Sequence, residues 1–313
     1  MIALLFPGQG AQEVGMGYAS YQRFPSAKAT FEEADEALGY SLSTLIFEGP
    51  EEELKLTAHT QPAILTTGIA LYRALTCDLG VKLNFDYVAG HSLGEYTALV
   101  AAGALSLGDA VKLVRRRGQL MQEAVPDGQG AMAAILGLDD DTVREVCAQF
   151  AGQGVCESAN FNCPKQVVIS GQADLVEKAC DLAKEKGARR AQMLKVSAPF
   201  HCSLMKPVAE PLSELMDTLD WKEPSAPLIA NVNAQPVTSV QTIKEGLKLQ
   251  SYSPVLWTQS VQKMEELGVK TYVEFGPGKV LGGMVKKIAT DPRIVTLENA
   301  DAIEAFAQSG GLV

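Results

Sequence analysis

Ser92 lies in the pentapeptide Gly90-His91-Ser92-Leu93-Gly94, which matches the pattern G-x-S-x-G. In this pattern the serine occupies a sharp turn between a strand and a helix, and glycines flank it because larger side chains would collide there. The hydroxyl is then exposed, and the free N–H groups of the helix, that of Leu93 among them, face the same place. The spacing predicts a serine nucleophile with Leu93 as an oxyanion donor. A glycine-rich packing turn is the alternative.

A serine hydroxyl is a weak nucleophile until a base takes its proton, and the chain contains three histidines. His91 is adjacent to Ser92, but successive side chains diverge at a turn, which favours a hydrogen-bonded buttress. His59 precedes a predicted helix and is typical of a surface residue. His201 follows a small predicted unit, where a returning loop would cross the cleft between two units. We therefore expect His201 to be either the base or a structural histidine.

Arg117 lies within a predicted helix over Leu107–Val125, for which Ser106 is a suitable N-cap. At 100° per residue it falls in the middle of the apolar stripe formed by Ala110, Leu113, Val114, Leu120, Met121 and Ala124. An inward-facing guanidinium keeps its charge and needs an anionic partner. That partner is either an internal Asp or Glu or a substrate carboxylate. Beside a serine nucleophile, the second option indicates an acyl group that ends in a free carboxylate.

Two glycine-rich loops resemble phosphate-binding sequences without matching them. Pro7-Gly8-Gln9-Gly10 has Glu13 where the dinucleotide fingerprint requires its third glycine, and Gly276-Pro277-Gly278-Lys279 lacks the first glycine of a P-loop. The first loop follows a predicted strand, where acyl-transfer enzymes place a second oxyanion donor. Gln9 is the candidate for that donor, and a plain structural turn is the alternative.

Strands and helices alternate on either side of these residues. Alternation of this kind predicts an α/β fold in which helices cover a parallel sheet. The predicted strands are Ile2–Phe6, Phe85–Ala89, Leu228–Val232 and Thr271–Phe275. The predicted helices are Pro25–Gly39, Gln61–Leu79 with Pro62 in its first turn, Glu95–Gly103, Leu107–Val125, Ser203–Leu219, Thr258–Leu267 and a last helix over Lys279–Ala289.

The middle of the chain has a different pattern, β-α-β-β-α-β, which is typical of a ferredoxin-like unit. Its predicted elements are Gly130–Leu138, Asp140–Phe150, Val155–Asn160, Gln166–Ser170, Ala173–Lys186 and Arg190–Val196. Turn sequences bracket this unit at Pro126-Asp127-Gly128 and Ser197-Ala198-Pro199. We expect a small domain over 128–196, inserted into a large domain made of 1–127 and 197–313.

The composition argues against several classes of protein. The 313 residues carry a formal net charge of −10, which disfavours nucleic acid as a partner. No apolar run approaches the length of a membrane-spanning helix, and the N-terminus lacks the features of a signal peptide, so a cytoplasmic protein is expected. The six cysteines form no C-x-x-C motif, and with three histidines a metal site is not expected.

Eight segments together resemble the malonyl-CoA:acyl carrier protein transacylases of fatty acid and polyketide synthesis. They span nearly the whole chain: FPGQGAQ at 6–12, GHSLGEYTALVAAGALS at 90–106, RRRG at 115–118, NFNCP at 160–164, SAPFHCSLMKP at 197–207, NVNAQPV at 231–237, SPVLWTQSV at 253–261 and FGPGKVL at 275–281. The combination is far more specific than the pentapeptide alone.

The resemblance implies a role for each matched site residue. Ser92 matches the acylated nucleophile, His201 its base, and Arg117 the clamp for the malonyl carboxylate. Gln9 and Leu93 match the oxyanion hole. Gln250 matches the residue whose main-chain carbonyl holds the histidine, which explains why no aspartate stands out as a third triad member. Asn160 matches a position near the acyl pocket, and Phe200 matches a bulky aromatic position in members selecting malonyl over branched groups.

The resemblance also implies a fold and a reaction. The expected fold is an α/β-hydrolase-like core with an inserted ferredoxin-like lobe. The expected reaction is ping-pong transfer of a malonyl group from malonyl-CoA to the phosphopantetheine thiol of acyl carrier protein, by a monomer without cofactor or metal. Because both carrier proteins and this chain are acidic, docking would require a local basic patch, for which Arg189, Arg190, Lys195, Lys286 and Lys287 are candidates.

Three alternatives remain at this stage. The chain could be a trans-acting polyketide synthase acyltransferase, a serine thioesterase or hydrolase, or a scaffold that binds acyl carriers without catalysis. The inward-facing Arg117 favours an acyl group that ends in a carboxylate. The lack of an evident Asp or Glu as third member of a catalytic triad disfavours an ordinary esterase. A scaffold has no need of Ser92, His201 and Arg117 together.

Overall fold

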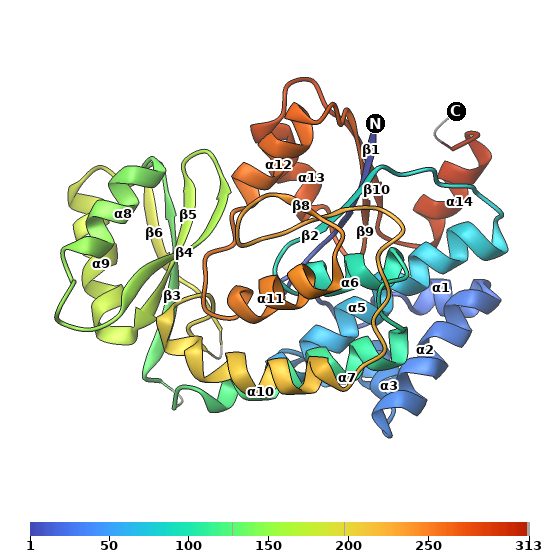
Figure 1. Cartoon of the computed structure of the whole chain (residues 1–313), viewed down its shortest axis with the longest axis horizontal. Helices are drawn as coiled ribbons and strands as arrows, with labels where there is room; N and C mark the ends of the chain where they lie inside the picture. The colour runs from blue at the N-terminus through green and yellow to red at the C-terminus, as the bar shows by residue number, and fades with distance from the viewer. Residues whose placement is uncertain (127, 197, 312–313) are drawn as a thin grey trace.

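Two β-sheets from different parts of the chain organise the structure, a computed structural model that describes residues 1–126, 128–196 and 198–311 (Figure 1). The larger sheet has the strand order β10-β9-β1-β2-β7-β8. Its strands are β1 (Ile2–Phe6), β2 (Tyr87–Gly90), β7 (Leu228–Ile229), β8 (Pro236–Val237), β9 (Thr271–Phe275) and β10 (Arg293–Leu297).

The central strands of the larger sheet are parallel, and only β7 and β8 pair antiparallel. The last four residues of β1 are buried apolar side chains, as expected for a strand covered on both faces. In the register of β1 and β2, Phe6 pairs with Gly90. The two strands therefore end side by side, and this places the Gln9 loop next to the turn that carries Ser92.

Helices cover both faces of this sheet, either directly or by packing on other helices. They are α1 (Tyr18–Arg23), α2 (Pro25–Leu38), α3 (Leu42–Glu48), α4 (Glu51–Leu54), α5 (Thr57–Arg73), α6 (Leu93–Ala101), α7 (Leu107–Glu123), α10 (Lys206–Asp217), α11 (Val240–Gln250), α12 (Trp257–Glu266), α13 (Val280–Ile288) and α14 (Ala300–Gln308), with a π-helical turn at Ala74–Asp78 and a 3-10 turn at Ser203–Met205. Within the described parts of the chain, no helix has the length and apolarity needed to cross a bilayer.

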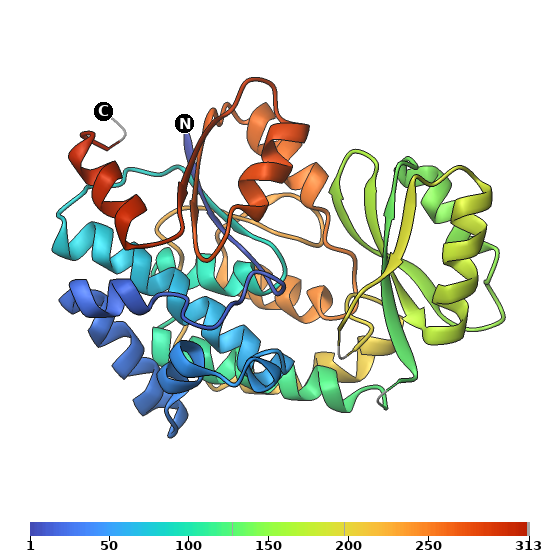
Figure 2. The ribbon, with the colours of Figure 1, turned by 180° about the vertical axis from the view of Figure 1, so that it is seen from behind.

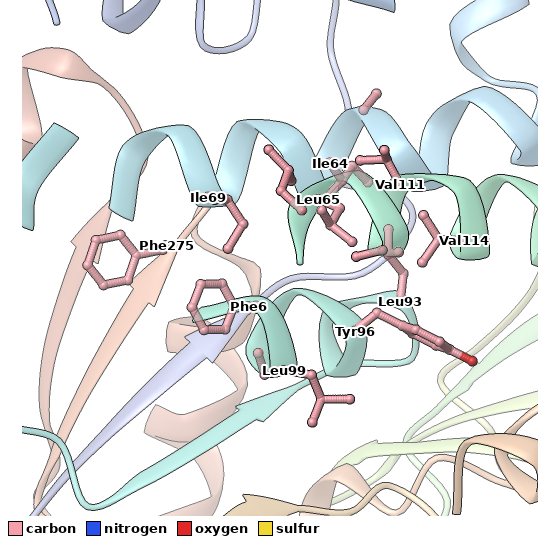
Figure 3. Packing of buried hydrophobic residues seen from close by; sticks show 14 of the residues in the cluster. Phe6, Ile64, Leu65, Ile69, Leu93, Tyr96, Leu99, Val111, Val114 and Phe275 are labelled. Carbon is pink, nitrogen blue, oxygen red and sulfur yellow. The ribbon is translucent and has the colours of Figure 1, made fainter. Parts of the chain in front are cut away.

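The main core lies between the sheet and the helices α5, α6 and α7. Figure 3 shows Ile64 and Leu65 of α5 facing Leu93 of α6 and Val111 of α7, with Phe6 below them. Nearly every residue of α5 is buried, as expected of a helix that other elements surround. The apolar residues on the other face of the sheet form a separate cluster with α12 and α13. Helix α6, which follows Ser92, is thus held within this main core.

The smaller sheet stands to one side of this body (Figures 1 and 2). Its strands β3 (Gly130–Leu136), β4 (Cys156–Cys163), β5 (Gln166–Gln172) and β6 (Arg190–Met193) are antiparallel in the order β4-β5-β3-β6. Helices α8 (Asp140–Ala148) and α9 (Ala173–Glu185) cover it and share a core cluster of their own with the sheet. The mixed α/β class, with one parallel sheet, agrees with the prediction.

The structure corrects several predicted elements. Helix α5 begins at Thr57, so Pro62 lies in its second turn rather than its first. The helix over residues 280–288 is not the last, because β10 and α14 follow it. Strand β10 lies at the edge of the sheet and is mostly half-buried, so it lacks the continuous apolar run of a central strand. Of the turns predicted to bracket the small unit, Asp127 and Ser197 lie outside the described residues.

Candidate active site

Ser92 occupies a strained turn between β2 and α6. Its backbone angles are φ 51° and ψ −105°, a left-handed conformation that is uncommon for a residue with a side chain. A Cβ atom on Gly90 would lie 1.9 Å from the carbonyl carbon of Gly94, and one on Gly94 would lie 1.9 Å from the carbonyl oxygen of Phe6. Both glycines are therefore required by the close approach of three backbone segments.

Asn231, in the loop after β7, holds this turn in place. Its side-chain NH₂ donates to the Gly90 carbonyl at 2.8 Å, and its Oδ1 accepts the Ser92 N–H at 2.7 Å. Sequence reasoning assigned Asn231 no role, although the segment NVNAQPV contains it. Because its N–H is engaged here, Ser92 does not supply an oxyanion donor.

His201 makes direct contact with Ser92 from 109 residues away in the chain. Its Nε2 lies 2.7 Å from the Ser92 Oγ, and its Nδ1 lies 2.9 Å from the main-chain oxygen of Gln250. His201 also has a left-handed backbone, with φ 59°. Burial, and then the positive charge of Arg117, lower the pKa of His201 to about 3. The imidazole is thus neutral and, with Nδ1–H donated to the carbonyl, presents its basic Nε2 to the hydroxyl.

Arg117 projects from α7 into the same site and is 1% exposed. Its Nη1 donates to Gln61 Oε1 at 2.8 Å, while its Nη2 lies 2.8 Å from Gln250 Oε1 and 3.1 Å from Ser92 Oγ. Burial lowers the pKa of Arg117. Among the described residues, no carboxylate forms an ion pair with it. A buried cation held by neutral acceptors can accept an anionic group from a ligand.

The side chain of Gln250 connects this cation to a buried acid that sequence reasoning missed. Gln250 Nε2 donates to Glu95 Oε2 at 2.6 Å and to the Ser92 carbonyl at 2.9 Å. Glu95 Oε1 accepts the Asn231 N–H at 3.3 Å. Burial raises the pKa of Glu95 to about 7, although these hydrogen bonds partly oppose the shift. The available signal was a charged residue, three positions after the serine, within an otherwise apolar helix start.

Gln9 and Leu93 lie at the two loop ends that the strand register brings together. Among the described residues, neither of their backbone N–H groups has a hydrogen-bond partner. The Gln9 side chain donates to Thr57 Oγ1 at 3.2 Å. The close approach of Gly8 to the His91 carbonyl, where a Cβ would lie 2.3 Å away, keeps the two loops in contact. Two free N–H donors beside Ser92 fit an oxyanion hole.

The other candidates lie around this centre. His91 does not contact Ser92 Oγ; its Nε2 lies 2.8 Å from Asn162 Oδ1, and burial lowers its pKa. His59 pairs with the Glu53 carbonyl instead. Asn160 is buried on β4, where it bridges to Val255, and Phe200 is buried immediately before His201.

Strand β4 of the smaller sheet contacts three segments of the site. Its Asn162 binds His91, and its Glu157 accepts the Ser203 N–H at 2.9 Å and the Ser203 hydroxyl at 2.6 Å. Its backbone also pairs with Val255, which donates to Ala159 and accepts from Phe161. The smaller sheet therefore holds the chain just after His201 and just after Gln250.

The basic residues predicted for carrier docking lie on both units of the structure. Arg190 begins β6 in the smaller sheet, whereas Lys286 and Lys287 end α13 on the larger one, so the proposed basic residues are divided between the two units. In the described residues, no group of three or more His, Cys, Asp or Glu side chains could hold a metal. All six cysteines are free.

This chain is similar in sequence to proteins of a known family. Residues 3–297 match the family model described as "Acyl transferase domain". The chain is 51% identical over 309 residues to the malonyl CoA-acyl carrier protein transacylase of Bacillus subtilis, covering 98% of this chain and 96% of that one. It is 46% identical over 303 residues to the protein of the same name from Escherichia coli K12, covering 97% of each.

Solved structures give the same result. The crystal structure of an acyl carrier protein S-malonyltransferase from Vibrio cholerae matches with a TM-score of 0.93 at 46% identity, covering 97% of this chain and 99% of that one. A complex of a type II PKS acyl-carrier protein with its malonyl-transacylase matches with a TM-score of 0.95 at 41% identity, covering 98% and 99%.

Proposed function

The chain belongs to the acyl transferase family, and on that premise we propose that it transfers a malonyl group from malonyl-CoA to the phosphopantetheine thiol of acyl carrier protein. One observation supports the proposed reaction most directly. The Ser92 hydroxyl lies 2.7 Å from His201 Nε2 and 3.1 Å from Arg117 Nη2, so that nucleophile, base and anion receptor meet at one oxygen.

The first half-reaction acylates Ser92. As the Ser92 oxygen attacks the thioester carbonyl of malonyl-CoA, His201 Nε2 takes the hydroxyl proton. The tetrahedral oxyanion is stabilised by the backbone N–H groups of Leu93 and Gln9, aided by the positive end of the α6 dipole. When the C–S bond breaks, His201 returns the proton to the sulfur, and CoA leaves as a thiol.

The second half-reaction reverses these steps with a different thiol. The phosphopantetheine thiol of the carrier protein gives its proton to His201 and attacks the malonyl ester of Ser92. Collapse of the second tetrahedral intermediate breaks the ester bond, and His201 protonates the departing Ser92 oxygen. The enzyme is restored without a cofactor or metal, because each proton taken up by His201 is returned within the same half-reaction.

Arg117 selects the malonyl group by binding its free carboxylate. The guanidinium is already oriented by Gln61 and Gln250, so little conformational freedom is lost when the carboxylate arrives. An acetyl group has no carboxylate and leaves this buried cation without an anion. Asn160 and Phe200 complete the acyl pocket, where the bulk of Phe200 excludes branched acyl groups.

The two sheets support a finer description of the fold. The parallel sheet with its nucleophile turn fits an α/β-hydrolase-like core, and the order β4-β5-β3-β6 with two helices fits a ferredoxin-like lobe. We place the lobe at 128–196 and the core at 1–127 and 197–313. Cys147 and Cys156 interact as free thiols, which fits a cytoplasmic protein.

The proposal is tested by following malonyl-CoA in the presence of holo- or apo-carrier protein. We expect malonyl groups to accumulate on holo-carrier protein, while apo-carrier protein, which lacks the phosphopantetheine thiol, remains unmodified. Release of free malonate at a rate independent of the carrier would instead identify a hydrolase.

A further inference from the structure

We infer that Glu95 is a positioning residue that fixes the orientation of the Gln250 amide and, through it, the anion-binding geometry of Arg117. The inference rests on the proposed function, in which Arg117 binds the malonyl carboxylate. Glu95 contacts neither Ser92 Oγ nor the guanidinium by a hydrogen bond. Its effect therefore has to pass through Gln250.

The hydrogen-bond polarity of the site allows only one orientation of the Gln250 amide. Its Oε1 faces Arg117 Nη2, which can only donate, and its Nε2 faces Glu95 Oε2, which as a carboxylate can only accept. The same Nε2 also donates to the Ser92 carbonyl. A rotated amide would face a donor with its NH₂ and an acceptor with its oxygen, at full burial.

Both oxygens of Glu95 face donors, and one of these donors cannot rotate. Oε1 accepts the backbone N–H of Asn231, while Oε2 accepts the amide of Gln250. A glutamine at position 95 would have one oxygen and one NH₂ for these two donors. Because the Asn231 N–H is fixed, the oxygen would pair with it, and the new NH₂ would face Gln250.

The Gln250 amide would then turn its oxygen toward residue 95 and its NH₂ toward Arg117. Arg117 would lose a neutral acceptor, and the Ser92 carbonyl would lose a donor. The guanidinium would move away from the new NH₂ and out of the plane in which it binds a carboxylate. Acetyl transfer does not use this cation, so the two substrates should respond differently.

The kinetic test compares malonyl-CoA with acetyl-CoA at pH 8 in the parent protein, Glu95→Gln and Glu274→Gln. Glu274 is a matched control, since it is fully buried on β9, two strands away from β2, and accepts the Leu281 and Gly282 N–H groups rather than any group of the site. We expect Glu95→Gln to lower the malonyl-to-acetyl ratio of kcat/KM at least tenfold, through the malonyl value. Glu274→Gln should leave that ratio unchanged, even if it lowers the melting temperature.

A second measurement does not depend on turnover. In ¹⁵N NMR spectra of protein labelled at its glutamines, the Gln250 side-chain NH₂ resonance is assigned by its absence in Gln250→Glu. At pH 8, donation to the ionised Glu95 carboxylate should place this resonance downfield, and Glu95→Gln should shift it upfield. A parent protein that takes up no malonyl group would contradict the proposed function, while the resonance would still test the role of Glu95. An unmoved resonance, or an unchanged substrate ratio in an active Glu95→Gln protein, overturns the inference.

Discussion

At the scale of single residues, the site combines a neutral base with a buried cation. Arg117 helps to keep His201 unprotonated, since its positive charge adds to the effect of burial on the histidine pKa. The main-chain oxygen of Gln250 replaces the carboxylate of a Ser-His-Asp triad, because it fixes the tautomer of His201 without adding a negative charge. The malonyl carboxylate therefore enters a site in which, among the residues that the structure describes, no carboxylate of a triad lies next to His201.

Replacing Arg117 with alanine should separate malonyl from acetyl transfer. Hydrogen bonds to a charged group contribute about 1.5–3 kcal/mol each, so loss of a two-bond clamp should lower kcat/KM for malonyl-CoA by about 10²–10⁴-fold. Acetyl-CoA, which has no carboxylate, should be accepted better relative to malonyl-CoA. Steady-state kinetics with both substrates measure the effect, and unchanged malonyl kinetics would rule out the clamp.

Glu95 should make the stability of the protein depend on pH. Burial raises its pKa from 4.5 to about 7, so the folded protein retains a proton that the unfolded chain releases near pH 4.5. This proton stabilises the folded state by about 3 kcal/mol at most. The stabilisation is fully present below pH 4.5 and is lost as the pH rises through 7. Chemical denaturation of the parent and Glu95→Gln measures it. The parent should lose stability relative to the variant as pH rises, whereas a constant difference would contradict the raised pKa.

At the scale of elements, the turn from β2 into α6 depends on close backbone packing. The Gly94 Cα faces the end of β1, and the Gly90 Cα faces α6 itself. The strain at Ser92 is maintained because Asn231 and Gln250 bind the backbone on both sides of it.

Glycine substitutions within helices test this packing. Gly94→Ala places a Cβ 1.9 Å from the Phe6 carbonyl oxygen and should destabilise the protein by more than about 3 kcal/mol, with loss of acyl transfer. Gly283 in α13 is a matched control, since a Cβ there meets no atom within 4 Å, and Gly283→Ala should stabilise by about 0.5–1 kcal/mol. Thermal unfolding measures both, and a Gly94→Ala protein of normal stability and activity would contradict the packing argument.

The sequence was most informative where a pattern is local. The nucleophile turn follows from glycine spacing, and the inward Arg117 follows from helical periodicity. The roles of Glu95 and Asn231 could not be predicted, because each depends on which donors the folded chain brings near it from other elements. The loop position of His201 made it a candidate base for Ser92, but its contact with Gln250 was available only through the family resemblance. Elements α11, β10 and α14 were among those missed. Strand β10 is a mostly half-buried edge strand without a continuous apolar run, whereas α11 and α14 each bury an apolar face, so their periodicity was available in the sequence.

At the scale of the whole molecule, the smaller sheet supports Ser92, His201 and Arg117, none of which it carries itself. Ser92 and Arg117 come from the larger body, while β4 fixes the segments that follow His201 and Gln250. The position of the base relative to the nucleophile therefore depends on how the smaller sheet is seated against the larger body (Figure 2).

Glu157→Gln should test this support. The substitution weakens the attachment of Ser203, two residues after His201, without changing the anion-binding residues. We expect kcat to fall about tenfold for malonyl and acetyl groups alike, since loss of a carboxylate-assisted hydrogen bond costs about 1.5 kcal/mol. The malonyl-to-acetyl ratio should stay constant. Glu177→Gln on α9, an exposed position of the same unit, is the control. A change in the ratio, or no change in kcat, would contradict this role for β4.

The central claim is that the Ser92 hydroxyl, activated by His201, becomes esterified with a malonyl group. Intact-protein mass spectrometry after brief mixing with malonyl-CoA, followed by peptide mapping, tests it most directly. The account predicts a mass increase of one malonyl group, located on Ser92, absent in Ser92→Ala and formed far more slowly in His201→Ala. Transfer to holo-carrier protein at the parent rate by Ser92→Ala, or a malonyl group mapped to another residue, would contradict it.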